Sequence, residues 1–354
     1  MKECLDVIVI GGGQAGLASG YYLQKKGLSF LILEGSNHAT GSWPHYYDSL
    51  KLFSPAQLSS LPGMKMPGKK RRYPIRVEVI RYLQDYAKKF DLPIRTNQRV
   101  TRVERNGNYF VIQTETGHVY QTKALINATG SFHNPYTPEI KGRESFLGEI
   151  LHSSTYRNPD PYTGKRVVVV GRGNSAIQIA VELADHCKTS LAVLQPVQFV
   201  KQKVWGLDLH YWIRAIGIDT FPFWRFGKQA PVSSAVADLG DYKTKLKAGM
   251  PDQRDMFTSF SPEGIIWPDG THEVVDTVIF ATGYRPELSF LEPIGALNAE
   301  GRPLQLGGVS LQVPGLYFVG LEGQRSFASA TLRGVGPDAK YVVKKLYTYL
   351  KRSD

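Results

Sequence analysis

The segment that most constrains this chain begins at Asp6 and reads DVIVIGGGQAGLASGYYLQKKGLSFLILE. Its apolar run of branched residues, Val7 to Ile10, is typical of a buried strand. Glycines follow with the spacing G-x-G-x-x-G at Gly11, Gly13 and Gly16. In this pattern the first glycine forms a tight turn, the second lets a pyrophosphate approach the backbone, and the third permits close contact between helix and strand. The segment therefore predicts a turn that binds a dinucleotide.

The rest of this segment completes the same unit. Leu17 to Lys26 is expected to be a helix that ends at Gly27, and Phe30 to Leu33 is expected to be a second buried strand. The N-terminus of such a helix presents unpaired N–H groups and a partial positive charge to phosphates. Glu34, about twenty residues beyond the glycines, can accept hydrogen bonds from a ribose. Strand, glycines, helix, strand and acid in this order predict a Rossmann-like unit.

A second unit of the same kind begins near the middle of the chain. Lys165 to Val170 is predicted to be a strand, and the run Gly171 to Ala176 opens a helix that reaches about His186. Ala176 occupies the third small position of the motif, which the pattern allows. Leu191 to Leu194 is the next expected strand. Two such units form an internal repeat, which implies two dinucleotides and two-electron transfer between them.

Shorter patterns organise the remaining chain. Three alternating segments within residues 100–122 predict a small antiparallel meander. Ala-Thr-Gly turns end two apolar strands, at residues 128–130 and 281–283. A strand at Leu316–Val319 and a terminal helix with Tyr341–Leu350 as its body lead the chain back to the first unit. The predicted fold is α/β, with two Rossmann-like dinucleotide-binding domains, the second inserted into the first.

The expected domain boundaries follow from these elements. The first domain comprises residues 1–158 and 285–354 and contains the meander, and the second comprises residues 159–284. Within the second domain, an insertion at about 197–253 fits no simple period. It is rich in aromatic residues, among them Trp205, Trp212 and Trp224.

This insertion has two interpretations. It is either a substrate-facing flap or oligomer surface, or a compact helical insertion with its own core. The second interpretation is preferred. A membrane-surface role is disfavoured, because the apolar residues are not segregated on one face.

Composition narrows the class of protein. The 354 residues are 42% hydrophobic and 21% charged, as in soluble globular enzymes, and contain no run of about eighteen apolar residues that could span a membrane. The strand expected close to the N-terminus leaves no room for a signal peptide. Cys4 and Cys187 lie far apart and form no C-x-x-C pattern, so neither a disulfide framework nor a dithiol centre is expected. These features predict a cytoplasmic protein.

The charge distribution bears on possible partners. A formal net charge of +12 would suit nucleic acid, but it also suits dinucleotide phosphates. The one dense basic run, Lys69–Arg72, lies between Pro67 and Pro74 and is interpreted as a solvated loop. No nucleic acid partner is therefore expected. The eight histidines form no ligand-like cluster, so no metal is expected either.

A third pattern, Phe146 to Tyr156, lies between the two glycine motifs and reads FLGEILHSSTY. It matches F-x-G-x-x-x-H-x-x-x-[FYW] at every fixed position, and in this the chain resembles the class B flavin-dependent monooxygenases. The resemblance covers essentially the whole chain, including both glycine motifs, Gly41-Ser42-Trp43 and the Ala-Thr-Gly turns in family order. The chain is most similar to short bacterial members. A tyrosine in the last position, in place of Trp, favours the N- and S-oxidising flavin-containing monooxygenases over the Baeyer–Villiger enzymes.

The resemblance implies FAD on the first unit and NAD(P)H on the second, with residues carried over by position. The implied FAD-binding residues are Gly11, Gly13, Gln14, Ala15, Gly16, Glu34, Ser42, Trp43, Val100, Ala128, Thr129, Gly130, Gly320, Thr331 and Leu332. The implied NAD(P)H-binding residues are Gly171, Arg172, Gly173, Asn174, Ser175, Ala176, Gln195, Ala281, Thr282 and Gly283. His152 and Tyr156 of the third pattern are expected to shape the interdomain linker rather than to perform chemistry.

One departure from the family concerns the face of the flavin. Many members carry an Asn in the segment that corresponds to Ser49–Pro55, where this chain has Phe53. An Asn amide could hydrogen-bond a flavin hydroperoxide, whereas Phe53 could only pack against it. Phe53 as an ordinary core residue is the equally weighted alternative.

A second departure concerns the choice of coenzyme. Gln195 and Pro196 follow the second strand of the second unit, where NADPH specificity usually requires Arg or Lys to pair with the 2′-phosphate. No acid is present there to favour NADH. Arg172, Lys201 or Lys203 could reach the phosphate instead. The sequence therefore predicts use of both coenzymes, with NADPH moderately favoured.

The activity implied by the resemblance is monooxygenation. NAD(P)H would reduce FAD, and O2 would then give a C4a-hydroperoxyflavin whose distal oxygen is attacked by a soft nucleophile such as a sulfide or amine. Ketones, oxidised by the Baeyer–Villiger route, are a further substrate class. The expected partners are a small apolar substrate and O2, and a homodimer is expected because it is the commonest oligomer. A regulatory flavoprotein associated with cation efflux and an NAD(P)H–flavin electron-transfer reductase are the alternatives.

Overall fold

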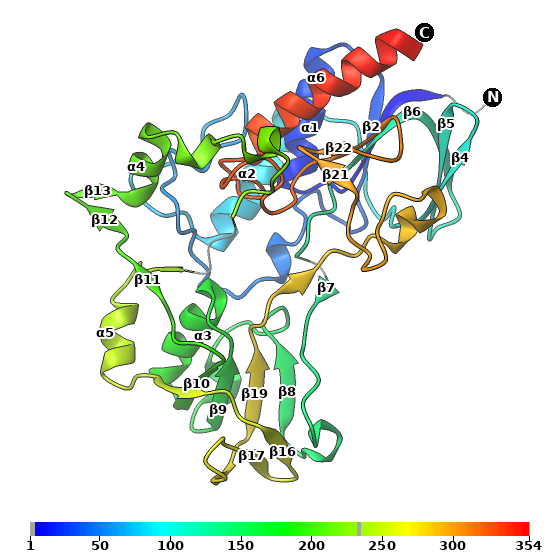
Figure 1. Cartoon of the computed structure of the whole chain (residues 1–354). Helices are drawn as coiled ribbons and strands as arrows, with labels where there is room; N and C mark the ends of the chain where they lie inside the picture. Colours follow the sequence, from blue (N-terminus) through cyan, green and yellow to red (C-terminus); the bar gives the residue numbers. More distant parts are fainter. Residues whose placement is uncertain (1–3, 133, 232–234, 354) are drawn as a thin grey trace.

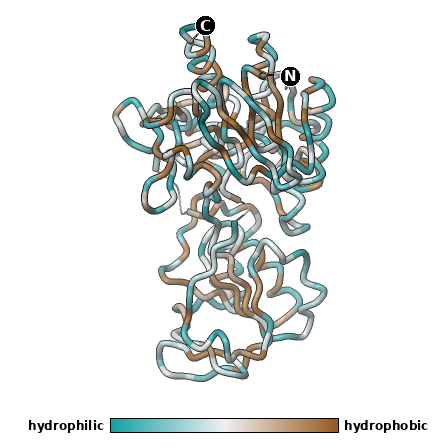
Figure 2. The backbone as a smooth tube through the Cα atoms, turned by 90° about the vertical axis from the view of Figure 1, so that its right-hand side faces the viewer, coloured by the Kyte–Doolittle hydropathy of each residue, from teal (hydrophilic) through white to brown (hydrophobic). Residues whose placement is uncertain are grey.

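The structure is a computed structural model that describes residues 4–132, 134–231 and 235–353. It contains two α/β units, one above the other in Figure 1, each built around a parallel sheet. Figure 2 shows apolar strands in the interior of both units and hydrophilic segments in the outer loops. The predicted α/β fold with two Rossmann-like units is confirmed.

The upper unit contains a nine-stranded sheet. The parallel part of this sheet has the order β23-β6-β1-β2-β3, with the strands β1 (Leu5–Ile10), β2 (Phe30–Leu33), β3 (Ile94–Arg95), β6 (Val119–Asn127) and β23 (Leu316–Phe318). Antiparallel pairing adds β4 (Val100–Asn106), β5 (Tyr109–Thr114), β21 (Gln305–Leu306) and β22 (Val309–Ser310). The predicted meander is formed by β4, β5 and β6.

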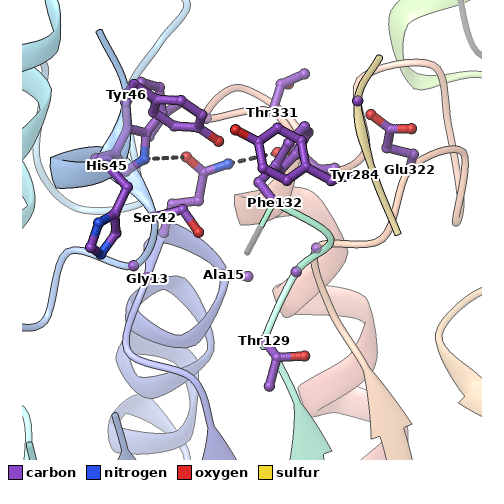
Figure 3. A pocket seen from close by; sticks show the side chains of 18 of the residues that line it. Gly13, Ala15, Ser42, His45, Tyr46, Thr129, Phe132, Tyr284, Glu322 and Thr331 are labelled. Atoms are coloured by element: carbon purple, nitrogen blue, oxygen red, sulfur yellow. Dashed lines mark hydrogen bonds between the residues drawn. The ribbon is translucent and has the colours of Figure 1, made fainter. Parts of the chain in front are cut away.

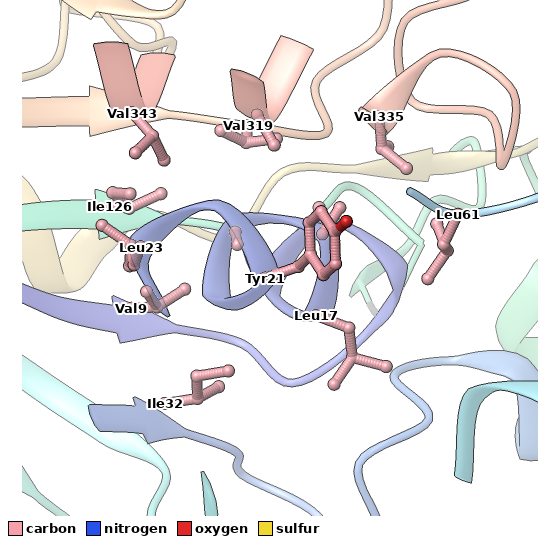
Figure 4. Close-up of a cluster of buried hydrophobic side chains, with 14 of the residues drawn as sticks. Val9, Leu17, Tyr21, Leu23, Ile32, Leu61, Ile126, Val319, Val335 and Val343 are labelled. Carbon is pink, nitrogen blue, oxygen red and sulfur yellow. The ribbon is translucent and has the colours of Figure 1, made fainter. Parts of the chain in front are cut away.

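Alternation along β1 divides the core of this unit into two layers. Val7 and Val9 face one side of the sheet, where α1 (Gln14–Lys25), α2 (Arg76–Lys89) and α6 (Val335–Ser353) pack. Figure 4 shows this layer, in which Leu23 of α1 lies beside Val9 of β1 and Val343 of α6 lies on the other side of Leu23. Ile8 and Ile10 face the opposite side, which β4, β5 and residues 288–297 cover.

The lower unit contains five parallel strands in the order β15-β10-β9-β19-β8. Their bounds are β8 (Glu149–His152), β9 (Arg166–Val170), β10 (Lys188–Val193), β15 (Asp252–Asp255) and β19 (Thr277–Phe280). The helix α3 (Asn174–Ala184) follows β9, and β16 (Ser259–Ser261), β17 (Gly264–Ile266) and β18 (His272–Val274) form an antiparallel sheet. The strand β8 belongs to this sheet although it precedes residue 159. The division of the chain into domains stays a prediction.

The aromatic insertion differs from the preferred interpretation. It consists of short elements: β11 (Phe199–Val200), β12 (Lys203–Val204), β13 (Leu207–Asp208), α4 (Leu209–Ala215), β14 (Val236–Ala237) and α5 (Tyr242–Lys247). Among the described residues, the buried hydrophobic clusters contain no cluster made by the insertion alone. Trp224 instead packs against Tyr341 of α6 in a tilted arrangement, with ring centroids 4.8 Å apart. The insertion therefore packs against both units, since Phe199, Val236 and Tyr242 join the core cluster of the lower unit, and the prediction of a self-contained core is wrong.

Two crossings of the chain and several hydrogen bonds connect the units. The strands β7 (Asn134–Pro135) and β20 (Tyr284–Arg285) pair antiparallel where the chain passes between the sheets. The Tyr47 hydroxyl of the upper unit donates to Gln178 Oε1 of α3 at 3.0 Å. Within the described part of the chain, no helix has the length and hydropathy required to cross a membrane.

Candidate active site

One cavity of about 1010 Å³ lies between the carboxyl ends of the two parallel sheets. Ile10, Leu33 and Ala128 line it from the ends of β1, β2 and β6. Gly173 and Ala281 line it from the turns after β9 and β19 of the other unit. Ligands of open α/β sheets bind at such carboxyl ends, so the position is that of a binding site for both units.

Both glycine turns have the same local geometry. Gly11 has φ +104°, and a Cβ atom built there would lie 2.6 Å from the Ala128 carbonyl oxygen. Gly171 has φ +135°, and its Cβ would lie 2.5 Å from the Ala281 carbonyl oxygen. A side chain is excluded at both positions by backbone conformation and by contact. The Ala-Thr-Gly turns are therefore the partners of the glycine turns in both units.

The glycine turns leave space that fits dinucleotide phosphates. Gly13 precedes α1 and Gly173 precedes α3, and neither helix has a side chain that caps its N-terminus. A Cβ on Gly13 would lie 3.2 Å from Gly41 Cα, so the chain passes close to the turn. A Cβ on Gly173 would meet no atom within 4 Å. Uncapped N–H groups beside glycines at the edge of a cavity are suited to bind pyrophosphate.

The carboxylate of Glu34 is held at the end of β2. Its Oε2 accepts a hydrogen bond from the Gly12 N–H at 2.6 Å, and its Oε1 accepts from the Ser36 N–H and hydroxyl, each at 2.8 Å. A carboxylate has about four acceptor sites, so capacity remains for a ribose hydroxyl. Ser36 lines the cavity but was not among the predicted residues. The sequence signal that could have identified Ser36 is its position two residues after Glu34.

A chain of hydrogen bonds joins two loops to Gln14, the first residue of α1. The Trp43 Nε1 donates to Gln14 Oε1 at 3.2 Å, and Gln14 Nε2 donates to the Ala330 carbonyl at 2.6 Å. The dashed lines of Figure 3 mark these two bonds, and Tyr46 lies beside them. Gln14 thus fixes the loop before α6 relative to the start of α1.

Most of the predicted FAD-binding residues meet in the cavity wall. The ones that line it are Gly11, Gly13, Gln14, Ala15, Glu34, Ser42, Trp43, Val100, Ala128, Thr129, Gly130, Gly320, Thr331 and Leu332. Gly16 does not line it. A Cβ on Gly16 would lie 1.9 Å from the Gly11 carbonyl oxygen, so this glycine serves the contact between helix and turn.

The predicted NAD(P)H-binding residues divide into two groups. The residues that line the cavity are Gly173, Asn174, Ser175, Ala281 and Gly283. The residues that do not line it are Gly171, Arg172, Ala176, Gln195 and Thr282. In the second group, Arg172 Nη1 donates to Gln195 Oε1 at 2.7 Å, so these two side chains contact each other on the outer side of the turn.

The two fingerprint residues lie outside the cavity wall. His152 Nε2 donates to the Gly283 carbonyl at 3.0 Å, while its Nδ1 accepts from the Ser154 N–H at 3.1 Å. Burial lowers the pKa of His152 below its ordinary value. The Tyr156 hydroxyl donates to Glu182 Oε2 at 2.9 Å, and burial raises the pKa of this tyrosine.

The insertion supplies part of the cavity wall, which agrees with the less favoured interpretation of it as a flap rather than with the preferred one. Phe53 lines the cavity and stacks on His210 of α4, with ring centroids 5.7 Å apart. Asp208 accepts hydrogen bonds from His210 Nδ1 and backbone N–H at 2.8 Å and from the Tyr73 hydroxyl at 2.5 Å. Burial opposes ionisation of Asp208, but these bonds and one from Gln202 outweigh it and lower the pKa of the carboxyl.

One further acid faces the cavity from the strand-end loop after β23. Figure 3 shows Glu322 on the side of the cavity where Tyr284 and Phe132 lie. Burial within the cavity raises the pKa of Glu322. Elsewhere in the described part of the chain, His, Cys, Asp and Glu side chains form no group of three that could hold a metal ion.

Comparisons with known proteins identify the family. The family model described as pyridine nucleotide-disulphide oxidoreductase matches residues 8–223. The chain is 38% identical to the uncharacterized oxidoreductase CzcO of Bacillus subtilis, over 96% of this chain and 99% of that protein. It is 28% identical to indole-3-pyruvate monooxygenase YUCCA4 of Oryza sativa, over 96% of this chain and 86% of that protein.

A solved structure agrees over the whole chain. A flavin-containing monooxygenase from Stenotrophomonas maltophilia superposes with a TM-score of 0.86 at 34% identity, covering 98% of this chain and 99% of that chain. The family resemblance inferred from the sequence is therefore confirmed, and with it the prediction of FAD and NADPH as cofactors. The chain belongs to the pyridine nucleotide-disulphide oxidoreductase family and, within it, to the class B flavin monooxygenases, and it is an oxidoreductase.

Proposed function

We propose that this protein oxygenates soft nucleophiles, namely sulfides and amines, with NADPH and O2 and with FAD as the bound flavin. One observation carries the proposal: a single cavity is lined by the glycine turns of both units, through Gly13 and Gly173. A nicotinamide on one unit and a flavin on the other would then share one space. The bound flavin supplies the chemistry of hydride acceptance and oxygen activation.

The residues of the upper unit would hold FAD. The N-terminus of α1 receives the pyrophosphate, and Glu34, oriented by Gly12 and Ser36, accepts from the ribose. The bond from Gln14 to Ala330 holds the loop at the flavin end in place. In the lower unit, the N-terminus of α3 receives the pyrophosphate of the coenzyme. Residues 1–158 with 285–354 would thus form the FAD domain, and residues 159–284 the coenzyme domain.

The insertion would serve as the substrate-facing wall. Leu209, His210 and Ile213 of α4 line the cavity beside Phe53. Their apolar surface excludes water from the reacting centre and favours an apolar substrate. Ketones are a second substrate class in this proposal, reached by the Baeyer–Villiger route.

Coenzyme choice follows from the turn after β9. Arg172 Nη1 donates to Gln195 Oε1, and this arginine would be the cation that pairs with a 2′-phosphate. Because this single arginine is bonded only to a neutral amide, its charge remains available to a 2′-phosphate. This supports a moderate preference for NADPH together with use of NADH. A cytoplasmic homodimer remains the prediction for the location and assembly of the protein.

The test uses purified protein, methyl phenyl sulfide, O2 and either coenzyme. Sulfoxide formation is expected with both coenzymes and at a lower KM for NADPH, measured by chromatography and by NAD(P)H consumption. Tightly coupled NADPH turnover without any oxygenated product would contradict the monooxygenase proposal. FAD binding with very slow NADPH turnover would favour a regulatory flavoprotein. A disulfide reductase is disfavoured because Cys4 and Cys187 are free and neither lines the cavity.

A further inference from the structure

Arg333 places a buried guanidinium in the wall of the cavity. It lies in the loop before α6, and its side chain is 4% exposed. Its Nε donates to both carboxylate oxygens of Asp219, at 3.0 and 3.1 Å. Asp219 belongs to the insertion and is buried as well. The ion pair therefore joins the insertion to the flavin-binding unit.

Asp219 occupies only one side of this guanidinium. Both of its oxygens approach Nε, so the outer edge, formed by Nη1 and Nη2, makes no hydrogen bond to any described residue. Nη1 is also shielded from solvent. A buried donor without an acceptor is unfavourable, and such groups in proteins usually have a partner. Because no water-sized group reaches Nη1, a ligand in the cavity can accept a hydrogen bond only from Nη2, and an ionised carboxylate oxygen is the acceptor that makes the strongest such bond.

The surroundings of Arg333 define the rest of the ligand. The Phe53 ring lies with its centroid 5.9 Å from Arg333 Cζ, and its stacking on His210 holds it in place. Ile213 and Phe327 add apolar surface to the same cavity. Asp219 already balances the positive charge of Arg333, so the pair carries no net charge, and burial of a dianion beside it would be far more unfavourable than burial of a monoanion. A small monoanion with an apolar or aromatic body fits these features.

We propose that Arg333 binds the carboxylate of the substrate, whose apolar body lies against Phe53. The substrate class is then a carboxylate-bearing sulfide or amine rather than a neutral one. This inference rests on the proposed function, because it calls the ligand a substrate. Binding of the anion itself can be measured without turnover. Asp219 acts as a positioning residue, since it orients the guanidinium through Nε and lowers its net attraction for an anion.

The experiment compares two probes that differ in charge, (phenylthio)acetate and 2-(phenylthio)acetamide. Isothermal titration calorimetry measures their Kd for the oxidised, FAD-loaded protein in the absence of coenzyme. The wild-type protein is expected to bind the carboxylate about 10-fold more tightly than the amide, because the hydrogen bond from Arg333 Nη2 is stronger to an ionised carboxylate than to a neutral amide oxygen. Arg333→Lys keeps the charge but loses the planar edge, so it is expected to reduce this preference and leave the Kd of the amide unchanged.

Asp219→Asn is the second variant, and its expected effect has the opposite sign. The Asn carbonyl can still accept from Arg333 Nε, but the competing charge is gone, so the carboxylate probe binds more tightly than to the wild type. A purely structural role of the ion pair would weaken both probes equally. FAD content, melting temperature and the Kd of NADPH serve as controls in both variants.

Equal affinity of the wild type for the two probes would overturn the inference, and so would equal weakening of both probes in Asp219→Asn. An altered flavin spectrum in Arg333→Lys with no change in probe selectivity would assign the open edge to the flavin and would also overturn it. Failure of the proposed function is distinguishable. A protein that oxygenates no sulfide but still selects the carboxylate contradicts only the monooxygenase proposal.

Discussion

At the scale of single residues, Gly11 and Gly27 illustrate two different reasons why a position requires glycine. Both have positive φ, +104° and +66°. A Cβ at Gly27 would meet nothing within 4 Å, whereas a Cβ at Gly11 would lie 2.6 Å from the Ala128 carbonyl oxygen. The first position needs glycine only for its backbone conformation, and the second also needs it for contact with the neighbouring strand end.

This difference predicts the effects of two alanine variants. Gly27→Ala is expected to lower the free energy of unfolding by about 1 kcal/mol, the usual cost of a left-handed alanine, and to keep FAD. Gly11→Ala must also displace the turn from β6, so it is expected to lose FAD as well. The ratio of flavin to protein absorbance and urea unfolding measure the two effects. Normal flavin content in Gly11→Ala would contradict the placement of FAD at this turn.

Phe53 allows a second test at this scale. Its backbone carbonyl accepts from Gln202 Nε2 at 2.9 Å, so the backbone position is fixed independently of the ring. Phe53→Asn is expected to decrease the hydrogen peroxide released per NADPH by about 5-fold, since an amide adds one hydrogen-bond donor at the flavin face. Phe53→Leu, which adds no donor, is the control. A similar change in both variants would attribute the effect to size.

Single residues also show what the sequence could predict. Gly11, Gly13, Gln14 and Glu34 line the cavity together, and the sequence could group them because they belong to a turn and a strand within one continuous segment. Arg333 could not be found in this way. Its role depends on Asp219, which forms no sequence motif with it. The two residues meet only because the insertion folds back on the upper unit.

At the scale of elements, α1 and α3 begin in the same way in the two units. Each follows a parallel strand, has a glycine at its N-cap and has no acidic residue in its first turn. The repeat was visible in the sequence because local spacing determines it. The fold of the insertion was not visible in the sequence, because its short strands and helices have no period. They are held by contacts such as the one between Trp224 and Tyr341.

The start of α3 gives a prediction for the coenzyme. A methyl group at Gly173 would clash with no protein atom but would occupy space at the helix N-terminus that the pyrophosphate needs. Gly173→Ala is therefore expected to raise the KM for NADPH about 10-fold with unchanged FAD content and stability. Gly240→Ala is the matched control, because Gly240 is exposed and its Cβ would make only an ordinary contact at 3.9 Å. An unchanged KM in Gly173→Ala would place the coenzyme elsewhere.

At the scale of the whole molecule, a few contacts determine how the two units face each other. β7 pairs with β20, and His152 at the end of β8 donates to the Gly283 carbonyl between β19 and β20. The α/β class and the insertion of one unit into the other were predictable from element order. The cavity between the units was not, because it depends on these long-range contacts.

His152 connects the orientation of the units to pH. Its Nδ1 accepts from the Ser154 N–H, so the neutral ring fits the site, and burial lowers its pKa from the ordinary 6.5. Between pH 6.5 and the lower native pKa, the unfolded chain binds the extra proton. The contribution of neutral His152 is therefore complete above pH 6.5 and decreases as the pH falls toward the native pKa.

The corresponding variant is His152→Asn. It is expected to be less stable than the wild type by about 1 kcal/mol at pH 7.5, for the loss of a buried hydrogen bond. The difference in the free energy of unfolding should shrink as the pH falls below 6.5, because only the wild type contains His152, whose protonation is unfavourable in the folded state. Urea unfolding at pH 7.5 and 5.5 measures both values. A difference that grows on acidification would show that the folded state binds the proton more strongly.

The pairing of β23 with β6 has a consequence for synthesis of the chain. Residues 149–280, which contain every strand of the five-stranded sheet, emerge from the ribosome before Leu316–Phe318 and α6 do. The second unit can therefore fold while the first still lacks one strand and one helix, with the edge of β6 unpaired. FAD is then expected to be acquired only after release of the C-terminus. A nascent chain stalled before residue 316 would be able to bind coenzyme but not flavin.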